Sequence, residues 1–282
     1  MTGLLGVALG ASVIWLYAGV TRALLVEWFT SPDASYGLIL GGVVAALVWR
    51  RRRLITVAAS SPMASAAAVF IVGFGLALYL AGLFAADLYT TRASFVVVAA
   101  GLLWFLGGAG ALRVMAAPLF FLLLAVPIPQ LVVNTITLPL QLVASRLAEM
   151  ALTSGGVPVF REGNVLELPS VTLEIVEACS GLRSAVSLIS VAALLAWATG
   201  GSAGRRLFLI AAAIPIAVFM NGMRVAATGA ASETWGVGMT VGTWHTATGW
   251  ATFVLSLAAL LATERWLSRT PAALRPAVIA IA

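Results

Sequence analysis

Three side chains with useful chemistry occur in the second half of the chain. Cys179 is the only cysteine and His245 is the only histidine, while Arg224 ends the string Asn-Gly-Met-Arg that starts at Asn221. A thiol attacks an amide well only as the thiolate, and its pKa falls near a helix N-terminus or a cation. Histidine can pass a proton to the leaving amine, and arginine can stabilise the thiolate or an oxyanion. These residue types predict nucleophilic catalysis by Cys179.

The chain order places these residues at the ends of three consecutive apolar segments. Cys179 precedes the first of them, Arg224 follows the second and His245 precedes the third. Consecutive membrane helices alternate in direction, so all three residues are expected at one membrane surface. Auxiliary candidates with the same location are Ser180, whose backbone N–H group the sulfur can reach, Arg183, one turn further along the helix, and Asn221.

Each residue also has an ordinary structural explanation. A lone cysteine in a membrane helix usually packs as a small apolar side chain, and an arginine at a helix end usually reaches the lipid headgroups. A lone histidine near a helix end is usually an interfacial hydrogen-bonding residue. None of these explanations predicts a shared location, which favours catalysis. One cysteine and one histidine are too few ligands for a metal site, so we expect no metal and no cofactor.

Composition decides the class of the surrounding protein. Of the 282 residues, 62% are hydrophobic and only 9% are charged, against about 25% charged residues in a soluble domain. In lipid the backbone must satisfy its own hydrogen bonds, and the long apolar runs favour helices over a barrel. We therefore predict an all-α polytopic membrane protein forming a single domain over residues 1–282. The net charge of +6 does not indicate nucleic-acid binding, because most of the arginines lie between apolar runs.

About eight apolar segments are long enough to serve as membrane helices. They lie near residues 3–20, 36–49, 66–86, 93–112, 114–128, 181–199, 207–223 and 246–264. The cluster Arg50-Arg51-Arg52-Arg53 is expected in the cytoplasm, because loops rich in basic residues remain there. Alternation from this cluster places both termini in the cytoplasm and the candidate site on the extracytoplasmic face.

The longest polar region, residues 129–180, is consequently expected outside the cytoplasm. Polar residues recur at helical spacing over 130–152, which predicts an amphipathic helix at the membrane surface. The stretch 158–176 alternates polar and apolar residues around Gly163-Asn164. This pattern predicts a small hairpin or three-stranded meander directly before the sixth span.

Three ordered strings in this part of the chain resemble the exosortase/archaeosortase family. They are Glu-Ala-Cys-Ser-Gly-Leu-Arg at 177–183, Asn-Gly-Met-Arg at 221–224, and His245 followed by Gly249-Trp250. The resemblance is strong over about 155–250, whereas the first five spans match only in number and hydropathy. The stretch that begins at Gly156 and the histidine at 245 are similar to the bacterial exosortase type.

The resemblance implies a multi-pass inner-membrane cysteine protease or transpeptidase with Cys179, Arg224 and His245 in its active site. It implies membrane-anchored protein substrates with a C-terminal sorting signal: a Pro-Glu-Pro-type motif, a transmembrane helix and a basic tail. It further implies a link to extracellular polysaccharide and biofilm production. Water, an amine or a lipid remain alternative acceptors for the acyl group.

Two other classes of protein share the membrane architecture. A transporter or polysaccharide-export component without peptidase activity would carry ionisable residues in mid-membrane and broken helices in repeated halves. The predicted span interiors are nearly free of charge, and no repeat is visible. A non-catalytic scaffold would not require a lone cysteine, arginine and histidine at one depth. The sequence therefore favours the peptidase.

Overall fold

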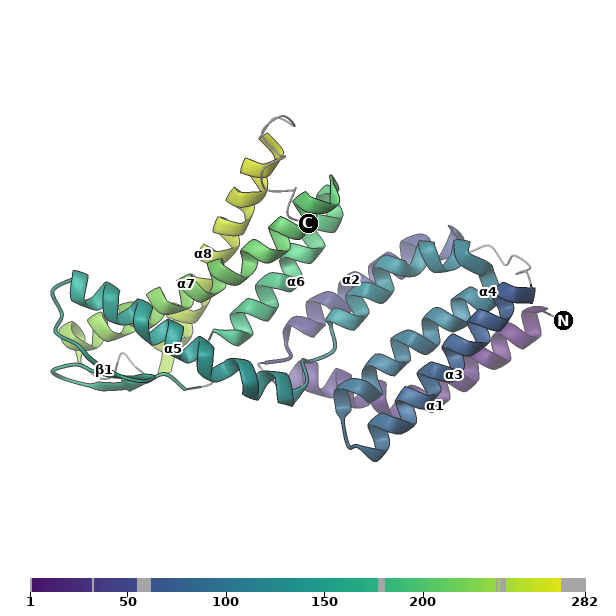
Figure 1. Cartoon of the computed structure of the whole chain (residues 1–282), viewed down its shortest axis with the longest axis horizontal. Coiled ribbons are helices and arrows are strands. Elements are labelled where there is room, and N and C mark those ends of the chain that lie inside the picture. Colours follow the sequence, from purple (N-terminus) through teal and green to yellow (C-terminus); the bar gives the residue numbers. More distant parts are fainter. Residues whose placement is uncertain are drawn as a thin grey trace. The chain divides into compact units, whose positions relative to one another are not determined.

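The computed structural model shows a helical protein in two compact units, Met1–Pro129 and Gln130–Ala282 (Figure 1). We call them the N-terminal unit and the C-terminal unit. The structure describes residues 2–31, 33–54, 62–176, 181–236, 238 and 242–269. Each unit is compact by itself. The expectation of one domain over 1–282 stays a prediction.

The described part of the N-terminal unit consists of four helices. Their bounds are α1 Thr2–Thr30, α2 Tyr36–Arg51 followed by the short 3₁₀ helix η1 Arg52–Leu54, α3 Pro62–Phe84, and α4 Leu88–Leu124. Asp87 caps α4, since its carboxylate accepts hydrogen bonds from the backbone N–H groups of Tyr89 and Thr90.

The element α4 consists of two helical segments. Gly108 has φ 66° and ψ −170°, which are not helical values, and the α4 ribbon turns back on itself near its middle (Figure 1). Two spans, 93–112 and 114–128, were expected in this region. The structure puts the break at Gly108 rather than next to Arg113, because a glycine adopts positive φ without a steric penalty.

Glycines allow α3 and α4 to approach closely. A Cβ atom at Gly75 would lie 2.6 Å from Val98 Cγ2, and one at Gly82 would lie 2.6 Å from the backbone nitrogen of Thr91. Small residues at helix crossings let backbones pack tightly in lipid, where the hydrophobic effect between helices is absent.

The C-terminal unit, over its described residues, has four helices and a small sheet. Its elements are α5 Gln130–Ser154, β1 Phe160–Glu162, β2 Val165–Glu167, β3 Thr172–Glu174, α6 Leu182–Thr199, α7 Ala203–Trp235 and α8 Gly242–Arg269. The three strands form an antiparallel sheet in the order β1-β2-β3. They lie within the stretch whose alternation predicted strands.

The helix α5 differs from the expected surface helix in how its polar residues are directed. Thr137, Gln141 and Ser145 are buried, while Leu131 is 78% and Met150 is 65% exposed. A helix at a water interface would show the opposite arrangement. A polar face that packs on protein and a largely apolar outer face suit a helix whose surroundings are lipid.

Seven helices of the described chain are long and apolar enough to cross a membrane. They are α1, α3, α4, α5, α6, α7 and α8. The polytopic all-α class is therefore confirmed, while the number of eight spans stays a prediction. The two numbers differ at three elements. The helix α2 has only 16 residues, and α4 contains two of the predicted spans. The helix α5 is long and apolar enough to span, although the sequence placed it at the membrane surface.

Candidate active site

The cysteine segment joins the sheet to the helix bundle. β3 ends at Glu174 and α6 begins at Leu182, and Cys179 comes between these two elements in the chain. Cys179 and Ser180 themselves lie outside the described residues. The nearest described neighbours are Val176 before them and Gly181 after them, and these two residues mark the ends of the cysteine segment.

Gly181 meets α7 at Asn221. A Cβ atom at Gly181 would lie 2.9 Å from both Cβ and Cγ of Asn221 and 3.0 Å from its Nδ2. Gly181 also has φ +85°, in the left-handed region that favours glycine. The Asn221 side chain is only 1% exposed. Gly181, which follows the predicted nucleophile by two residues, therefore packs the start of α6 against the middle of α7.

Arg224 follows Asn221 by almost one turn of α7 and is partly buried. Its Nη1 atom lies 3.6 Å from the position that a Cβ atom would occupy at Gly249 of α8. His245 precedes Gly249 by four residues, so its Cα lies one turn away on the same side of α8. Of His245 the structure describes only the backbone.

The structure thus brings the described parts of all three strings onto α7. Asn221 contacts the segment that follows Cys179, and Arg224 contacts the helix that carries His245. Arg183, the second arginine candidate, is exposed on the first turn of α6. The two arginines therefore differ in their surroundings, a difference that their positions in the sequence do not reveal.

The helices behind the site form one packed core. Its fully buried members come from α6, α7 and α8 and include Leu188, Leu209 and Leu260. At the far end from Gly181, Arg205 of α7 forms an ion pair with Glu264 of α8, and both side chains are mostly buried. The shared core and the ion pair thus join α6, α7 and α8 into one packed bundle.

The helix α7 extends well beyond the predicted end of its span at residue 223, to Trp235. The additional turns pack against α5 and the sheet. In this second core Ala144, Ala148 and Leu152 of α5 meet Leu166, Leu168 and Ile175 of the sheet region and Val225 and Ala226 of α7. Glu233 also accepts hydrogen bonds from the N–H and hydroxyl groups of Ser170, at 2.9 and 2.7 Å.

Sequence reasoning missed the contact roles of Gly181, Gly249 and Glu233. For the first two a signal existed, since both glycines stand inside the quoted strings and a close approach of another element needs a glycine. For Glu233 no local signal existed, because its partner Ser170 is 63 positions away.

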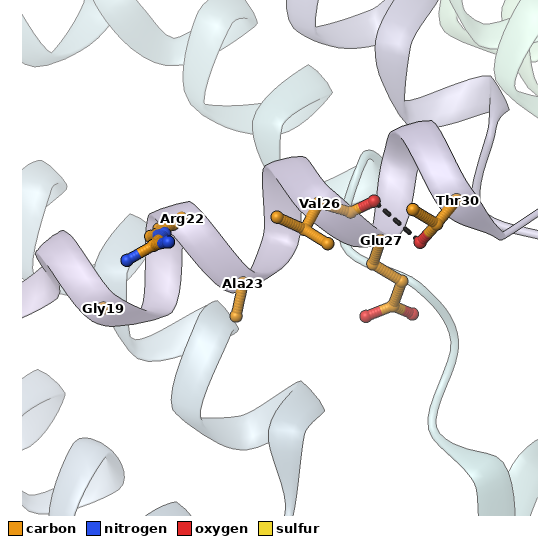
Figure 2. A pocket seen from close by; sticks show the side chains of 6 residues that line it. All are labelled: Gly19, Arg22, Ala23, Val26, Glu27 and Thr30. Carbon is orange, nitrogen blue, oxygen red and sulfur yellow. Dashed lines mark hydrogen bonds between the residues drawn. The ribbon is translucent and has the colours of Figure 1, made fainter.

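The N-terminal unit has a groove of its own. It has a volume of about 510 Å³ and follows one face of α1, lined by Gly19, Arg22, Ala23, Val26, Glu27 and Thr30 (Figure 2). Glu27 also forms an ion pair with the buried Arg92 at 2.5 Å. None of the predicted catalytic residues lines this groove. Within the described residues no three His, Cys, Asp or Glu side chains are placed to hold a metal ion.

Comparison with known protein families gives a match over most of the chain. The family model for transmembrane exosortases matches residues 28–262, which covers most of the chain and both compact units. No curated protein and no solved structure matches the chain. The match agrees with the resemblance in the three strings and extends it to the N-terminal helices.

Proposed function

Because the chain belongs to the transmembrane exosortase family, we propose that it is an integral membrane cysteine transpeptidase whose active site consists of Cys179, Arg224 and His245. Ser180, Arg183 and Asn221 are proposed as auxiliary residues. The alternative of an export or transport component without peptidase activity lacks support from a matching family.

The arrangement around α7 is the observation that carries this proposal. Asn221 packs on Gly181, and Arg224, three residues later, lies against Gly249. Cys179 is two residues from the first contact and His245 one helical turn from the second. Residues that are 66 positions apart in the sequence are therefore expected at one place, with a guanidinium between them.

The proposed reaction has two acyl-transfer steps. The Cys179 thiolate bonds to the scissile carbonyl carbon, and the Arg224 guanidinium stabilises the oxyanion that develops. The C–N bond then breaks, the leaving amine takes a proton from the His245 imidazolium, and a thioester remains. An acceptor attacks the thioester, its proton passes to His245, and the sulfur leaves again as thiolate.

The substrates are proposed to be exported proteins that carry a C-terminal sorting signal with its own transmembrane helix. Such a helix presents the cleavage motif at one depth, which supplies orientation for acyl transfer. We place the active site on the extracytoplasmic face of the inner membrane, with both chain termini in the cytoplasm. A Pro-Glu-Pro-type motif and a role in extracellular polysaccharide or biofilm production belong to the same proposal.

Co-expression with a tagged substrate tests the function. The substrate carries the motif, a transmembrane helix and a basic tail, and processing is followed as a mass shift of the tagged product. We expect processing by the wild type and none by Cys179→Ala or Cys179→Ser, with membrane insertion unchanged. The control is Ser12→Ala, which makes a similarly small change on the exposed surface of α1. Substantial processing by Cys179→Ala would end the cysteine-peptidase proposal.

A further inference from the structure

We propose that the outer edge of β3 binds the extended backbone of the substrate next to the scissile bond, so that the substrate adds a fourth strand to the sheet. This inference rests on the proposed peptidase function. It specifies how the peptide is held, which neither the family match nor the catalytic residues define. The required ligand is an extended peptide with free backbone N–H and C=O groups.

The register of the sheet shows which backbone groups point outward. Ile175 N donates to Asn164 O at 3.0 Å, and Leu168 N donates to Val171 O at 2.9 Å. These bonds direct residues 171, 173 and 175 toward β2, so Thr172 and Glu174 direct their groups to the opposite side. The Glu174 carbonyl already accepts from Val176 N at 3.1 Å. The edge consequently offers the N–H and C=O of Thr172 and the N–H of Glu174.

The two edge strands of the sheet differ in their surroundings. β1 is tied to α5 by the ion pair between Arg161 and Glu149 at 2.5 Å. Next to β1, the hydroxyl of Ser145 donates to the carbonyl of Gly163 at 2.9 Å. On β3, Thr172 and Glu174 are exposed, and within the described residues nothing bonds to the outward groups of Thr172. An unpaired edge of this kind is a template for pairing with another strand.

The sheet is held firmly enough to serve as a template. Leu166 and Ile175 lie fully inside the core shared with α5 and α7, and Glu233 binds Ser170 in the turn that leads into β3. The amide of Asn164 also donates to Ile175 O at 3.1 Å. A bound peptide therefore meets a preformed edge and need not order it, which lowers the entropic cost of binding.

The short stretch of chain between β3 and Cys179 favours β3 as the edge that binds the substrate peptide. Cys179 follows Thr172 by seven residues and Glu174 by five, so Thr172 is at most about 23 Å from Cys179 along an extended chain. A peptide paired with β3 would run toward the thiol and place its scissile bond within this distance. Strand addition of this kind reads the backbone by hydrogen bonds and the side chains at alternate positions.

Two substitutions at one position separate backbone pairing from side-chain contact. Thr172→Pro removes the outward N–H and places a ring at the edge, a position where proline is tolerated in sheets. Thr172→Val retains the N–H, the branched shape and the strand preference. Loss of one backbone hydrogen bond corresponds to about a 3- to 10-fold effect. We expect Thr172→Pro to process the tagged substrate at least about fivefold more slowly, and Thr172→Val to be affected much less, because its backbone groups are unchanged.

Photo-crosslinking in the full-length Cys179→Ala variant supplies a second measurement that does not depend on turnover. A photoreactive phenylalanine at Thr172 should capture the uncleaved tagged substrate. The same residue at Phe160, which lies in the same cross-strand row on the opposite edge and is 64% exposed, should capture much less.

Each outcome bears on the proposal. Normal processing by Thr172→Pro, an equal loss in Thr172→Val, or equal capture from both positions would overturn strand addition. If Thr172→Pro fails to accumulate in the membrane, the ratio of the two crosslinks decides alone. A wild-type rate in Cys179→Ala would instead refute the proposed function, so the two failures are distinguishable.

Discussion

At the scale of single residues, the environment separates side chains of the same type. Arg183 and Arg224 both stand near the cysteine segment and carry the same charge. Arg183 is exposed at the start of α6, while Arg224 is partly buried and its guanidinium lies against Gly249. A charge that is shielded from water and held in place stabilises a developing oxyanion more strongly than a solvated one.

We therefore expect Arg224→Lys to lower processing by about 100-fold or more. A lysine lacks the planar, forked guanidinium that holds an anion in fixed geometry. Arg183→Lys should keep most of the activity, because an exposed auxiliary charge needs no fixed geometry. Rates of processing of the tagged substrate check both. An active Arg224→Lys together with an inactive Arg183→Lys would show that the two roles are exchanged.

Gly181→Ala is expected to reduce processing strongly. The new Cβ atom would lie 2.9 Å from the Asn221 side chain at φ +85°, and either the start of α6 or Asn221 would have to move. Gly156→Ala is the matched control, since Gly156 has φ +80° and no atom within 4 Å of the added Cβ. It reports the backbone strain alone, about 1–2 kcal/mol. Equal activity of the two variants would contradict a role for the Gly181 contact.

At the scale of elements, α7 is the helix that contacts the other elements of the candidate site. Its first half packs with α6 and α8, and its second half packs with α5 and the sheet. Asn221, Gly222 and Arg224 lie between these two cores. At Gly222 the seam with α5 is closest, because a Cβ atom there would lie 2.6 Å from Leu147 Cβ.

Gly222→Ala should therefore destabilise the C-terminal unit by about 1–3 kcal/mol, the usual cost of overpacking. Thermal unfolding of the purified protein in detergent measures this cost as a lower Tm. The control is Gly73→Ala in α3, where no atom lies within 4 Å of the added Cβ. The control should be neutral or stabilising, because alanine favours a helix over glycine by about 0.5–1 kcal/mol. A Tm of Gly222→Ala at or above that of the control would contradict the close seam.

At the scale of the whole molecule, the arginines predict which end of each unit faces the cytoplasm. In the N-terminal unit the guanidinium of Arg51 donates to the carbonyl of Val114 at 2.7 Å. The cluster 50–53 and Arg113 therefore lie at the same end of that unit, as the rule for basic loops requires. Alternation along the chain puts the sheet and the cysteine segment at the extracytoplasmic side when α5 is not counted as a span, and in the cytoplasm when it is. The sequence predicts the first arrangement.

Cysteine accessibility measures this orientation. In a Cys179→Ser background, a single cysteine in place of the exposed Glu162 should react with a membrane-impermeant thiol reagent added to the outside of intact spheroplasts. A cysteine in place of the exposed Arg53 should react only after the membrane is opened. Reversal of this pattern would show that the chain has the opposite orientation.

The sequence by itself determined the membrane class and most helices, and it supplied the residues that are proposed as reactive. Lipid is the reason: a span must be apolar along its length, so the hydropathy of residues 182–199 defines α6 without any partner. Cys179 and His245 are each unique in the chain, and the chemistry of their side chains does not depend on the fold.

Only the tertiary structure decided where the helices end, where they turn and which of their sides are buried. The turns after Val225 are less apolar than a span, and they are helical because α5 and the sheet pack on them. The polar side of α5 is buried against protein, where Ser145 donates a hydrogen bond to the carbonyl of Gly163. The contact of Gly181 with Asn221 joins residues 40 positions apart. Such pairings depend on distance in space: a glycine in the sequence indicates that a close approach is possible, but not which residue makes it.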